Sequence, residues 1–182
     1  EWHLQGHQSW SMAVNLSTLQ FEQPSLVNTV LNCLALHHVP PEMLILEVTE
    51  TTAMSNPDES VRVLTELTEA GVKASIDDFG TGYSSLLYLK RLPACELKID
   101  RAFVKELSGE SEDATIVSAI VALAKTLNLK VVAEGVETEA QQAFLTELGC
   151  NTLQGYLLGK PVSAQTIEAL CARGEMLPGA GL

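Results

Sequence analysis

The sequence predicts an α/β fold in which strands and helices alternate six times along the chain. Short apolar runs, typical of buried strands, are each followed by a segment whose apolar residues recur at helical spacing. The expected strands are Met12–Val14, Leu44–Leu46, Val72–Ile76, Glu96–Asp100, Val131–Ala133 and Thr152–Leu158. Regular alternation with short connections favours parallel strands joined by right-handed crossovers.

The intervening helices are predicted from their apolar stripes and from signals at their ends. Asn56-Pro57 places a proline at a first helical position. Thr138 and Gln141 form the capping-box pattern of a helix start. The expected helices are Pro24–His38, Pro57–Gly71, Ser84–Leu92, Ala114–Leu127, Thr138–Gly149 and Ser163–Ala172.

Two architectures fit this alternation, a barrel and a doubly wound sheet. No Gly-x-Gly-x-x-Gly opens a helix, and Gly80-Thr81-Gly82 lacks the third glycine, which disfavours the dinucleotide-binding sheet. A complete (β/α)₈ barrel needs about 250 residues and eight strands. We therefore expect a modified (β/α)₈ TIM-type barrel, here six β/α units with the first two strands absent. Residues 1–11 are expected to be the end of an upstream helix, and residues 175–182 a loose tail.

Composition and charge exclude several classes of function. The chain has 182 residues, 46% of them hydrophobic, which is enough for one domain with a sizeable core. Its net charge of -12 argues against a DNA or RNA polymer as partner. The longest apolar run, Ile116–Ala124, is far shorter than a membrane span, so no membrane contact is expected from this chain. Four widely spaced cysteines fit a reducing cytoplasm.

Polar residues suited to a metal site follow each predicted strand. Any one of them alone is explained as well by a helix cap or a solvated acid. Six successive strand ends of this kind favour a metal-dependent phosphate site, because the carboxyl ends of barrel strands meet at one rim. Carboxylate and amide oxygens are ligands for Mg²⁺ and Mn²⁺. The residues are Asn15, Glu47, Glu50, Asp77, Asp78, Lys98, Asp100, Glu134, Glu137 and Gln154.

At these positions the sequence resembles the EAL-domain cyclic di-GMP phosphodiesterases. The motifs that carry the resemblance are Val14-Asn15-Leu16-Ser17, Glu47-Val48-Thr49-Glu50, Asp77-Asp78-Phe79-Gly80-Thr81-Gly82-Tyr83-Ser84-Ser85, Leu97-Lys98-Ile99-Asp100, Ala133-Glu134-Gly135-Val136-Glu137-Thr138 and Gln154-Gly155-Tyr156. The resemblance covers nearly the whole of residues 1–182. It implies a modified (β/α)₈ barrel that uses two divalent ions, Mg²⁺ or Mn²⁺, to hydrolyse cyclic di-GMP to linear pGpG in bacterial signalling.

The resemblance also implies a role for each residue. One metal is expected to be bound by Asn15, Glu47 and Asp77, and a second by Asp77, Asp78 and Glu134. The catalytic set is expected to be Lys98, which orients the nucleophilic water, together with Glu50, Glu137 and Gln154. Glu50 is expected to hold the Asp78–Ser85 loop, and Glu137 to support the site from behind the ligands.

One departure from the family pattern is the absence of the Glu-Ala-Leu motif, whose glutamate binds the first metal in that family. The simplest interpretation is a C-terminal portion of the domain. Two alternatives to an active hydrolase stay open: a silent module that binds cyclic di-GMP and regulates a partner, and an inactive fragment of the enzyme. The resemblance further implies a cytoplasmic homodimer, with sensory or GGDEF-type domains upstream and attachment to a membrane through a larger protein as one arrangement.

Overall fold

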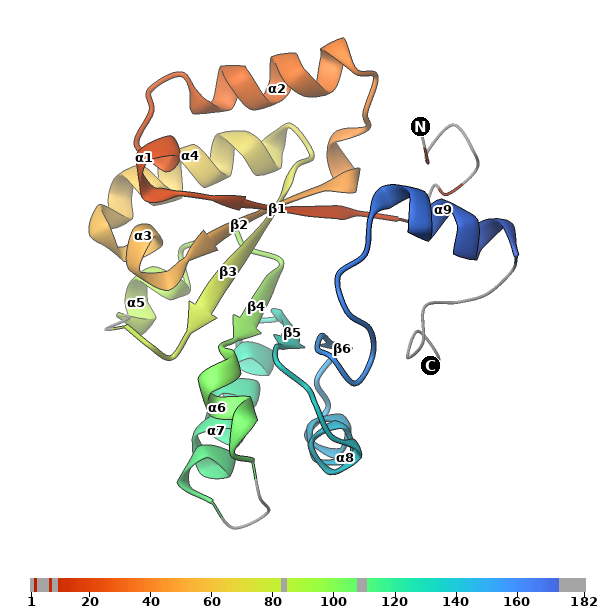
Figure 1. Ribbon diagram of the computed structural model, residues 1–182. Helices are drawn as coiled ribbons and strands as arrows, with labels where there is room; N and C mark the ends of the chain where they lie inside the picture. The colour runs from red at the N-terminus through yellow and green to blue at the C-terminus, as the bar shows by residue number, and fades with distance from the viewer. Residues whose placement is uncertain (1, 3–6, 8–9, 83–84, 108–110, 174–182) are drawn as a thin grey trace. The chain divides into compact units, whose positions relative to one another are not determined.

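The computed structural model describes residues 2, 7, 10–82, 85–107 and 111–173. Its strands are neighbours in the order β1 to β6, which is also their order in the chain (Figure 1). The pairs β1–β2, β2–β3 and β5–β6 are parallel. The strands are β1 (Met12–Leu16), β2 (Leu44–Thr49), β3 (Lys73–Phe79), β4 (Glu96–Ile99), β5 (Lys130–Ala133) and β6 (Thr152–Leu153).

Helices connect successive strands, as the alternating pattern predicts. They are α1 (Thr18–Phe21), α2 (Leu26–Leu36), the 3₁₀ turn η1 (Pro41–Met43), α3 (Glu50–Ser55), α4 (Pro57–Glu69), α5 (Leu86–Leu89), α6 (Arg101–Lys105), α7 (Glu112–Thr126), α8 (Glu139–Leu148) and α9 (Ala164–Ala172). The predicted α/β class with six β/α units of a TIM-type barrel is confirmed by this order of elements.

The structure corrects the ends of four predicted strands. The strands that were expected to stop at Val14 and Leu46 continue to Leu16 and Thr49, so Asn15 and Glu47 lie inside β1 and β2. The expected strand Thr152–Leu158 ends at Leu153, because Gly155 begins a turn in which Leu158 N donates to Gly155 O (3.1 Å). The predicted strand that stopped at Ile76 continues to Phe79, so Asp77 and Asp78 lie inside β3. The expectation for residues 1–11 falls mostly outside the described residues, and that for 175–182 falls wholly outside them.

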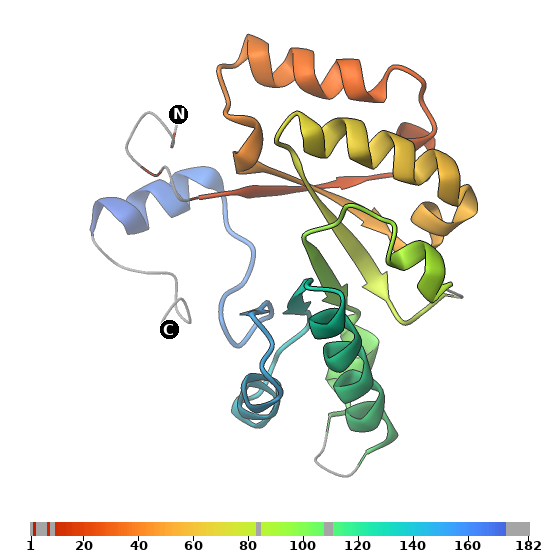
Figure 2. The same cartoon turned by 180° about the vertical axis from the view of Figure 1, so that it is seen from behind.

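The chain divides into two compact units, which are described separately. Unit 1 comprises residues 1–97 and 127–129. In it, α2 and α4 pack against each other on the same side of β1, β2 and β3, as both ribbon views show (Figures 1 and 2). Val48, Leu64 and Ile76 are fully buried between strands and helices. Burying apolar side chains at about 25 cal/mol per Å² is the main term that stabilises this layer.

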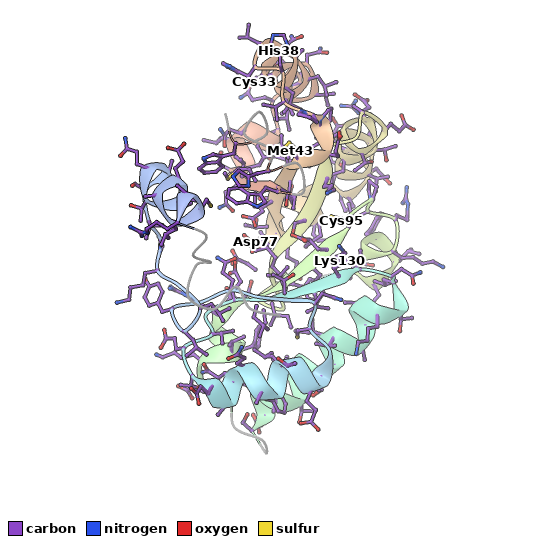
Figure 3. All side chains as sticks on the ribbon, turned by 90° about the vertical axis from the view of Figure 1, so that its right-hand side faces the viewer. Cys33, His38, Met43, Asp77, Cys95 and Lys130 are labelled. Carbon is purple, nitrogen blue, oxygen red and sulfur yellow. The ribbon has the colours of Figure 1, made fainter. Side chains whose placement is uncertain are left out.

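An apolar groove of about 580 Å³ lies beside β1 in unit 1. Strand residues Met12 and Val14 face it and are 50% and 42% exposed. Cys33 of α2 and Met43 of η1, both labelled in Figure 3, also line it. The groove therefore lies between the first strands and α2. The acidic residues at the strand ends do not line it.

Unit 2 comprises residues 98–126 and 130–182. Helix α7 packs against α6 and β5, and Val117, Val131 and Leu145 are fully buried there. The predicted capping box at Thr138 and Gln141 is present at the start of α8. At the other end of α8, Lys125 Nζ donates to Leu148 O (2.6 Å). None of the helices among the described residues has the length and apolar content needed to cross a membrane.

Candidate active site

In unit 1, three neighbouring strands bring an amide and two carboxylates into contact. The register of β1 and β2 places Asn15 beside Glu47. With its amide turned so that the nitrogen faces the acids, Asn15 can donate to Glu47 Oε2 (3.2 Å) and to Asp77 Oδ2 (3.3 Å). Both acids are more than nine-tenths buried, and Figure 3 labels Asp77 on the ribbon of β3. The sequence predicted this group as ligands of one metal, and the structure brings the three side chains together.

Asp78 lies beside Asp77 through an unusual backbone conformation. Consecutive residues of a regular strand point to opposite faces of the sheet. Asp78 has φ +53°, in the left-handed region that aspartate tolerates better than most residues. A carboxylate oxygen of Asp78 lies within 4.8 Å of one of Asp77, and Asp78 N donates to Asp77 Oδ1 (2.9 Å). The kink explains how adjacent strand residues offer oxygens on the same side.

Glu50 contacts the loop that follows these acids. It is the first residue of α3 and only 2% exposed. Its Oε2 accepts hydrogen bonds from Gly80 N (2.8 Å) and Gly82 N (3.3 Å). A methyl group on Gly82 would lie 3.0 Å from Glu50 Oε1, so the loop backbone fits closely against the carboxylate. Glu50 therefore binds the backbone of this loop.

In unit 2, Lys98 and Glu134 form an ion pair. Lys98 Nζ lies 2.8 Å from Glu134 Oε1, and the two side chains are 5% and 18% exposed. Lys98 is on β4 and Glu134 follows β5, and Glu134 N donates to Ile99 O (3.2 Å). Because charges buried this deeply are costly unless paired, the contact stabilises both ionised side chains.

Two other predicted site residues in unit 2 are exposed. Glu137 N donates to the Gln141 side chain (2.8 Å), while the Glu137 carboxylate is open to solvent. Gln154 follows β6, and its backbone bonds to Ala133 O (2.8 Å) and Val136 N (3.0 Å). Their backbones are thus held in unit 2, whereas their side chains are available to a ligand.

Two residues have structural partners that the sequence only partly revealed. Asp100 is the N-cap of α6 and accepts from Ala102 N (2.7 Å). Gln141 was predicted only as half of a capping box, yet its amide nitrogen also donates to Val104 O (3.0 Å) and Lys105 O (3.1 Å). No local sequence pattern indicates that second contact, because it joins residues more than thirty positions apart.

The donor types in unit 1 fit a divalent cation. Two buried carboxylates and an amide that can present its oxygen by rotating match the ligand preference of Mg²⁺ and Mn²⁺. In unit 2 a lysine beside a carboxylate supplies a cation that can donate hydrogen bonds to water or to phosphate oxygen. Each of these sets of groups is more typical of chemistry on a phosphate ester than of nucleophilic catalysis by a side chain.

Comparison with known families decides between the possible assignments. The family model of the EAL domain matches residues 1–161. The chain belongs to the EAL domain family. This EAL domain is 64% identical over 167 residues to the bifunctional diguanylate cyclase/cyclic di-GMP phosphodiesterase MucR of Pseudomonas aeruginosa. It is 46% identical over 166 residues to the cyclic di-GMP phosphodiesterase NbdA of the same organism. These matches cover 92% and 91% of the chain but only 24% and 21% of the two relatives.

Solved structures agree with this assignment. The MucR phosphodiesterase in complex with c-di-GMP superposes with a TM-score of 0.89, covering 91% of this EAL domain and 67% of that chain. BlrP1 of Klebsiella pneumoniae, in a complex with manganese and cyclic di-GMP, gives 0.74 at 34% identity and covers 83% of this chain and 39% of that one. The TIM-type fold class is therefore shown by likeness as well as by the order of the strands.

Proposed function

We propose that this EAL domain is part of a phosphodiesterase that hydrolyses cyclic di-GMP to linear pGpG with two divalent cations, Mg²⁺ or Mn²⁺. The observation that carries the proposal is the contact among Asn15, Glu47 and Asp77, which concentrates buried acids at the ends of adjacent strands. Relatives named as cyclic di-GMP phosphodiesterases share up to 64% of their residues with the chain over the matched region.

The proposed ligands divide into two sets that share Asp77. Asn15, Glu47 and Asp77 hold one cation, and Asp77, Asp78 and Glu134 hold the other. The left-handed backbone at Asp78 supports the sharing, because it keeps both aspartate carboxylates available on one side of β3. Bound in pairs, such cations lower the pKa of a coordinated water and neutralise charge on a phosphate.

Each remaining residue has a task that its contacts support. The Lys98 ammonium, held by Glu134, donates a hydrogen bond that orients the attacking water. Glu50 fixes the loop that contains Gly80 and Gly82, so that Asp77 and Asp78 keep their positions. The amide of Gln154, which is exposed, lies beside the water bound by the cations, and Glu137 supports the site from behind the ligands.

The proposal extends to the protein that contains this domain. Because the chain spans about a quarter of MucR, which is named for two activities, further domains of sensory or GGDEF type are proposed upstream. We place the domain in the cytoplasm, with cyclic di-GMP as its substrate. We also propose that it forms a homodimer. Sedimentation of the purified protein measures the last of these directly.

The test measures manganese-dependent conversion of cyclic di-GMP to pGpG by chromatography. It compares this chain, a version extended to include the residues that precede it, and Asp77→Asn in each. Asp58→Asn, a change of an exposed acid on α4, is the matched control. We expect turnover that needs Asp77 and the metal but not Asp58. Tight binding of cyclic di-GMP without any turnover in the extended version would overturn the hydrolase and leave the silent binding module.

A further inference from the structure

The carboxamide of Gln141 uses all of its hydrogen-bonding capacity on two separate backbone segments. Oε1 accepts from Glu137 N (2.8 Å) and Thr138 N (2.9 Å). Nε2 donates to Val104 O (3.0 Å) and Lys105 O (3.1 Å). A neutral amide has two donors and one oxygen with two acceptor sites, so no capacity remains. The side chain is only 5% exposed, and water cannot readily replace it.

Gln141 bonds to backbone groups at the ends of two helices. The last carbonyls of a helix and the N–H groups at a helix start have no partner within the helix. Val104 and Lys105 are the last two residues of α6, and Thr138 is the N-cap of α8. One side chain therefore joins the end of α6 to the start of α8.

The two joined segments each begin at a residue of the candidate site. Lys98 lies two residues before Asp100, the cap of α6. Glu134 begins the loop that ends at Thr138. The ion pair between Lys98 and Glu134, at 2.8 Å, bridges the same two segments that Gln141 bridges at their far ends.

We propose that Gln141 is a positioning residue that fixes the loop 134–138 against α6 and thereby sets the Lys98–Glu134 contact. This inference rests on the proposed function for its consequence in catalysis. Gln141 touches neither side chain of the pair and acts only through the backbone it binds.

Close packing of the loop explains how a displacement at Gln141 reaches the ion pair. Gly135 has φ +74°, and a methyl group on it would lie 2.6 Å from Arg101 Cβ at the start of α6. A methyl group on Gly155 would lie 2.1 Å from Val136 O. Because the loop backbone packs closely at Gly135 and Val136, a displacement at its Thr138 end is transmitted to these contacts.

The experiment changes Gln141 and its neighbour Gln142 in the extended version of the protein. Gln141→Leu removes all four hydrogen bonds, and Gln141→Glu keeps the accepting oxygen but turns a second oxygen toward the Val104 and Lys105 carbonyls. We expect kcat to fall by about tenfold to a hundredfold in both variants, with KM within about twofold of the parent. Gln142→Leu and Gln142→Glu make the same chemical changes one residue further along α8 and should leave kcat unchanged.

A second readout does not depend on turnover. In crystal structures of the variants, the Lys98–Glu134 distance should exceed 4 Å in Gln141→Leu and remain near 2.8 Å in the Gln142 variants. If Gln141→Leu does not fold, Gln141→Glu supplies both readouts. Kinetics are measured well below each melting temperature, so that lost stability alone cannot lower kcat.

The outcomes separate the two proposals. A parent protein that does not hydrolyse cyclic di-GMP overturns the proposed function, while the crystallographic distance still tests the positioning role. An active parent with unchanged kcat in both Gln141 variants, or an intact ion pair in both, overturns the positioning role. A fall in melting temperature without a change in kcat also overturns it, because a purely structural residue behaves that way.

Discussion

Glu50 in unit 1 and Gln141 in unit 2 hold loops of the candidate site in different ways. Both lie in the first turn of a helix, both are buried, and both accept two backbone hydrogen bonds from a loop. A carboxylate can only accept, so Glu50 serves the loop alone. A carboxamide also donates, so Gln141 joins its loop to a second helix.

The difference between the Glu50 carboxylate and the Gln141 carboxamide shows that each suits a different kind of contact. A charged acceptor makes the stronger hydrogen bonds, worth about 1.5–3 kcal/mol each, to the backbone of a glycine-containing loop. A neutral amide costs less to bury, and it can bridge a segment that offers N–H donors and a segment that offers carbonyl acceptors. Exchanging the two chemistries should therefore cost less in unit 1, where a glutamine still accepts, than in unit 2, where a glutamate cannot donate.

The largest expected effect comes from replacing Asp77, the proposed shared ligand of both cations. Asp77→Asn keeps the shape of a side chain that is 7% exposed but removes its negative charge. Turnover of cyclic di-GMP should fall by more than about a hundredfold, since a shared ligand of both cations is lost. Kinetics at saturating manganese, with circular dichroism to confirm an unchanged fold, measure this. Activity within tenfold of the parent would contradict the two-metal assignment.

The next effect tests the Glu50 contact. Glu50→Ala leaves Gly80 N and Gly82 N without their acceptor, so activity should fall about tenfold to a hundredfold and manganese affinity should fall with it. Glu50→Gln retains an accepting oxygen and should lose much less. Manganese titration and kinetics on both variants provide the comparison. Equal losses in the two variants would show that the charge of Glu50, and not its acceptor geometry, is what the site requires.

A smaller effect compares glycines in the two units. A methyl group on Gly155 would meet Val136 O at 2.1 Å, which is backbone and cannot move aside. On Gly82 it would meet Glu50 Oε1 at 3.0 Å, the end of a side chain. Gly155→Ala should therefore destabilise the protein by about 1–3 kcal/mol, and Gly82→Ala by clearly less. Urea unfolding of both variants measures the difference; the reverse order would mean that the loop in unit 1 is the more tightly packed.

Much of the fold was predictable, because alternating apolar periodicities define the six strands and the long helices. The short helices α1, α3 and α6 were missed, since four to six residues are too few to show a helical period. Strand β6 was predicted too long because its apolar residues continue past the turn at Gly155. Local patterns thus predict elements better than their ends.

The sequence predicted which residues of the candidate site lie at or near the end of which strand. The geometry of the site was not predictable, because it depends on the register of the strands and on the backbone angle φ of Asp78. Asn15 lies opposite Glu47, but Asp77 lies opposite Thr49, two residues further along β2. The left-handed conformation of Asp78 and the second contact of Gln141 are consequences of tertiary structure. No spacing of residue types in the chain indicates either one.

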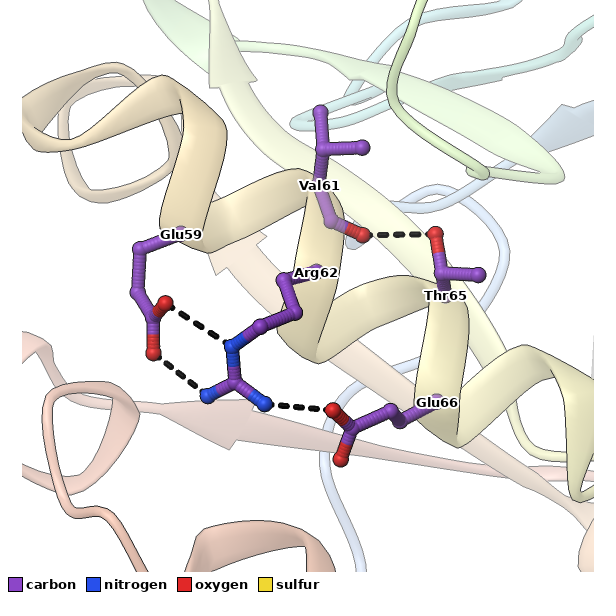
Figure 4. A network of polar contacts seen from close by, with 5 residues as sticks. All are labelled: Glu59, Val61, Arg62, Thr65 and Glu66. Atoms are coloured by element: carbon purple, nitrogen blue, oxygen red, sulfur yellow. Dashed lines mark hydrogen bonds and ion pairs between the residues drawn. The ribbon is translucent and has the colours of Figure 1, made fainter.

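The smallest expected effect comes from charged contacts far from the loops. On the exposed side of α4, Arg62 bonds to Glu59 and Glu66 one turn away on either side (Figure 4). Such solvated pairs are screened and contribute little to stability. Arg62→Met should change the melting temperature by no more than about 2 °C and leave turnover unchanged, in contrast to Glu50→Ala and Gln141→Leu.

The pH dependence of this small effect has a definite sign. Hydrogen bonding to Arg62 lowers the pKa of Glu59 below its ordinary value of 4.5. The folded state therefore binds fewer protons than the unfolded state near that pH, so the stabilisation is fully present above the ordinary pKa and disappears as the pH falls through the folded value. Thermal melts of the parent and Arg62→Met should converge on acidification below that range, and also at about 1 M salt. A difference that persists under both conditions would mean that Arg62 contributes through packing of its aliphatic stem and not through its charge.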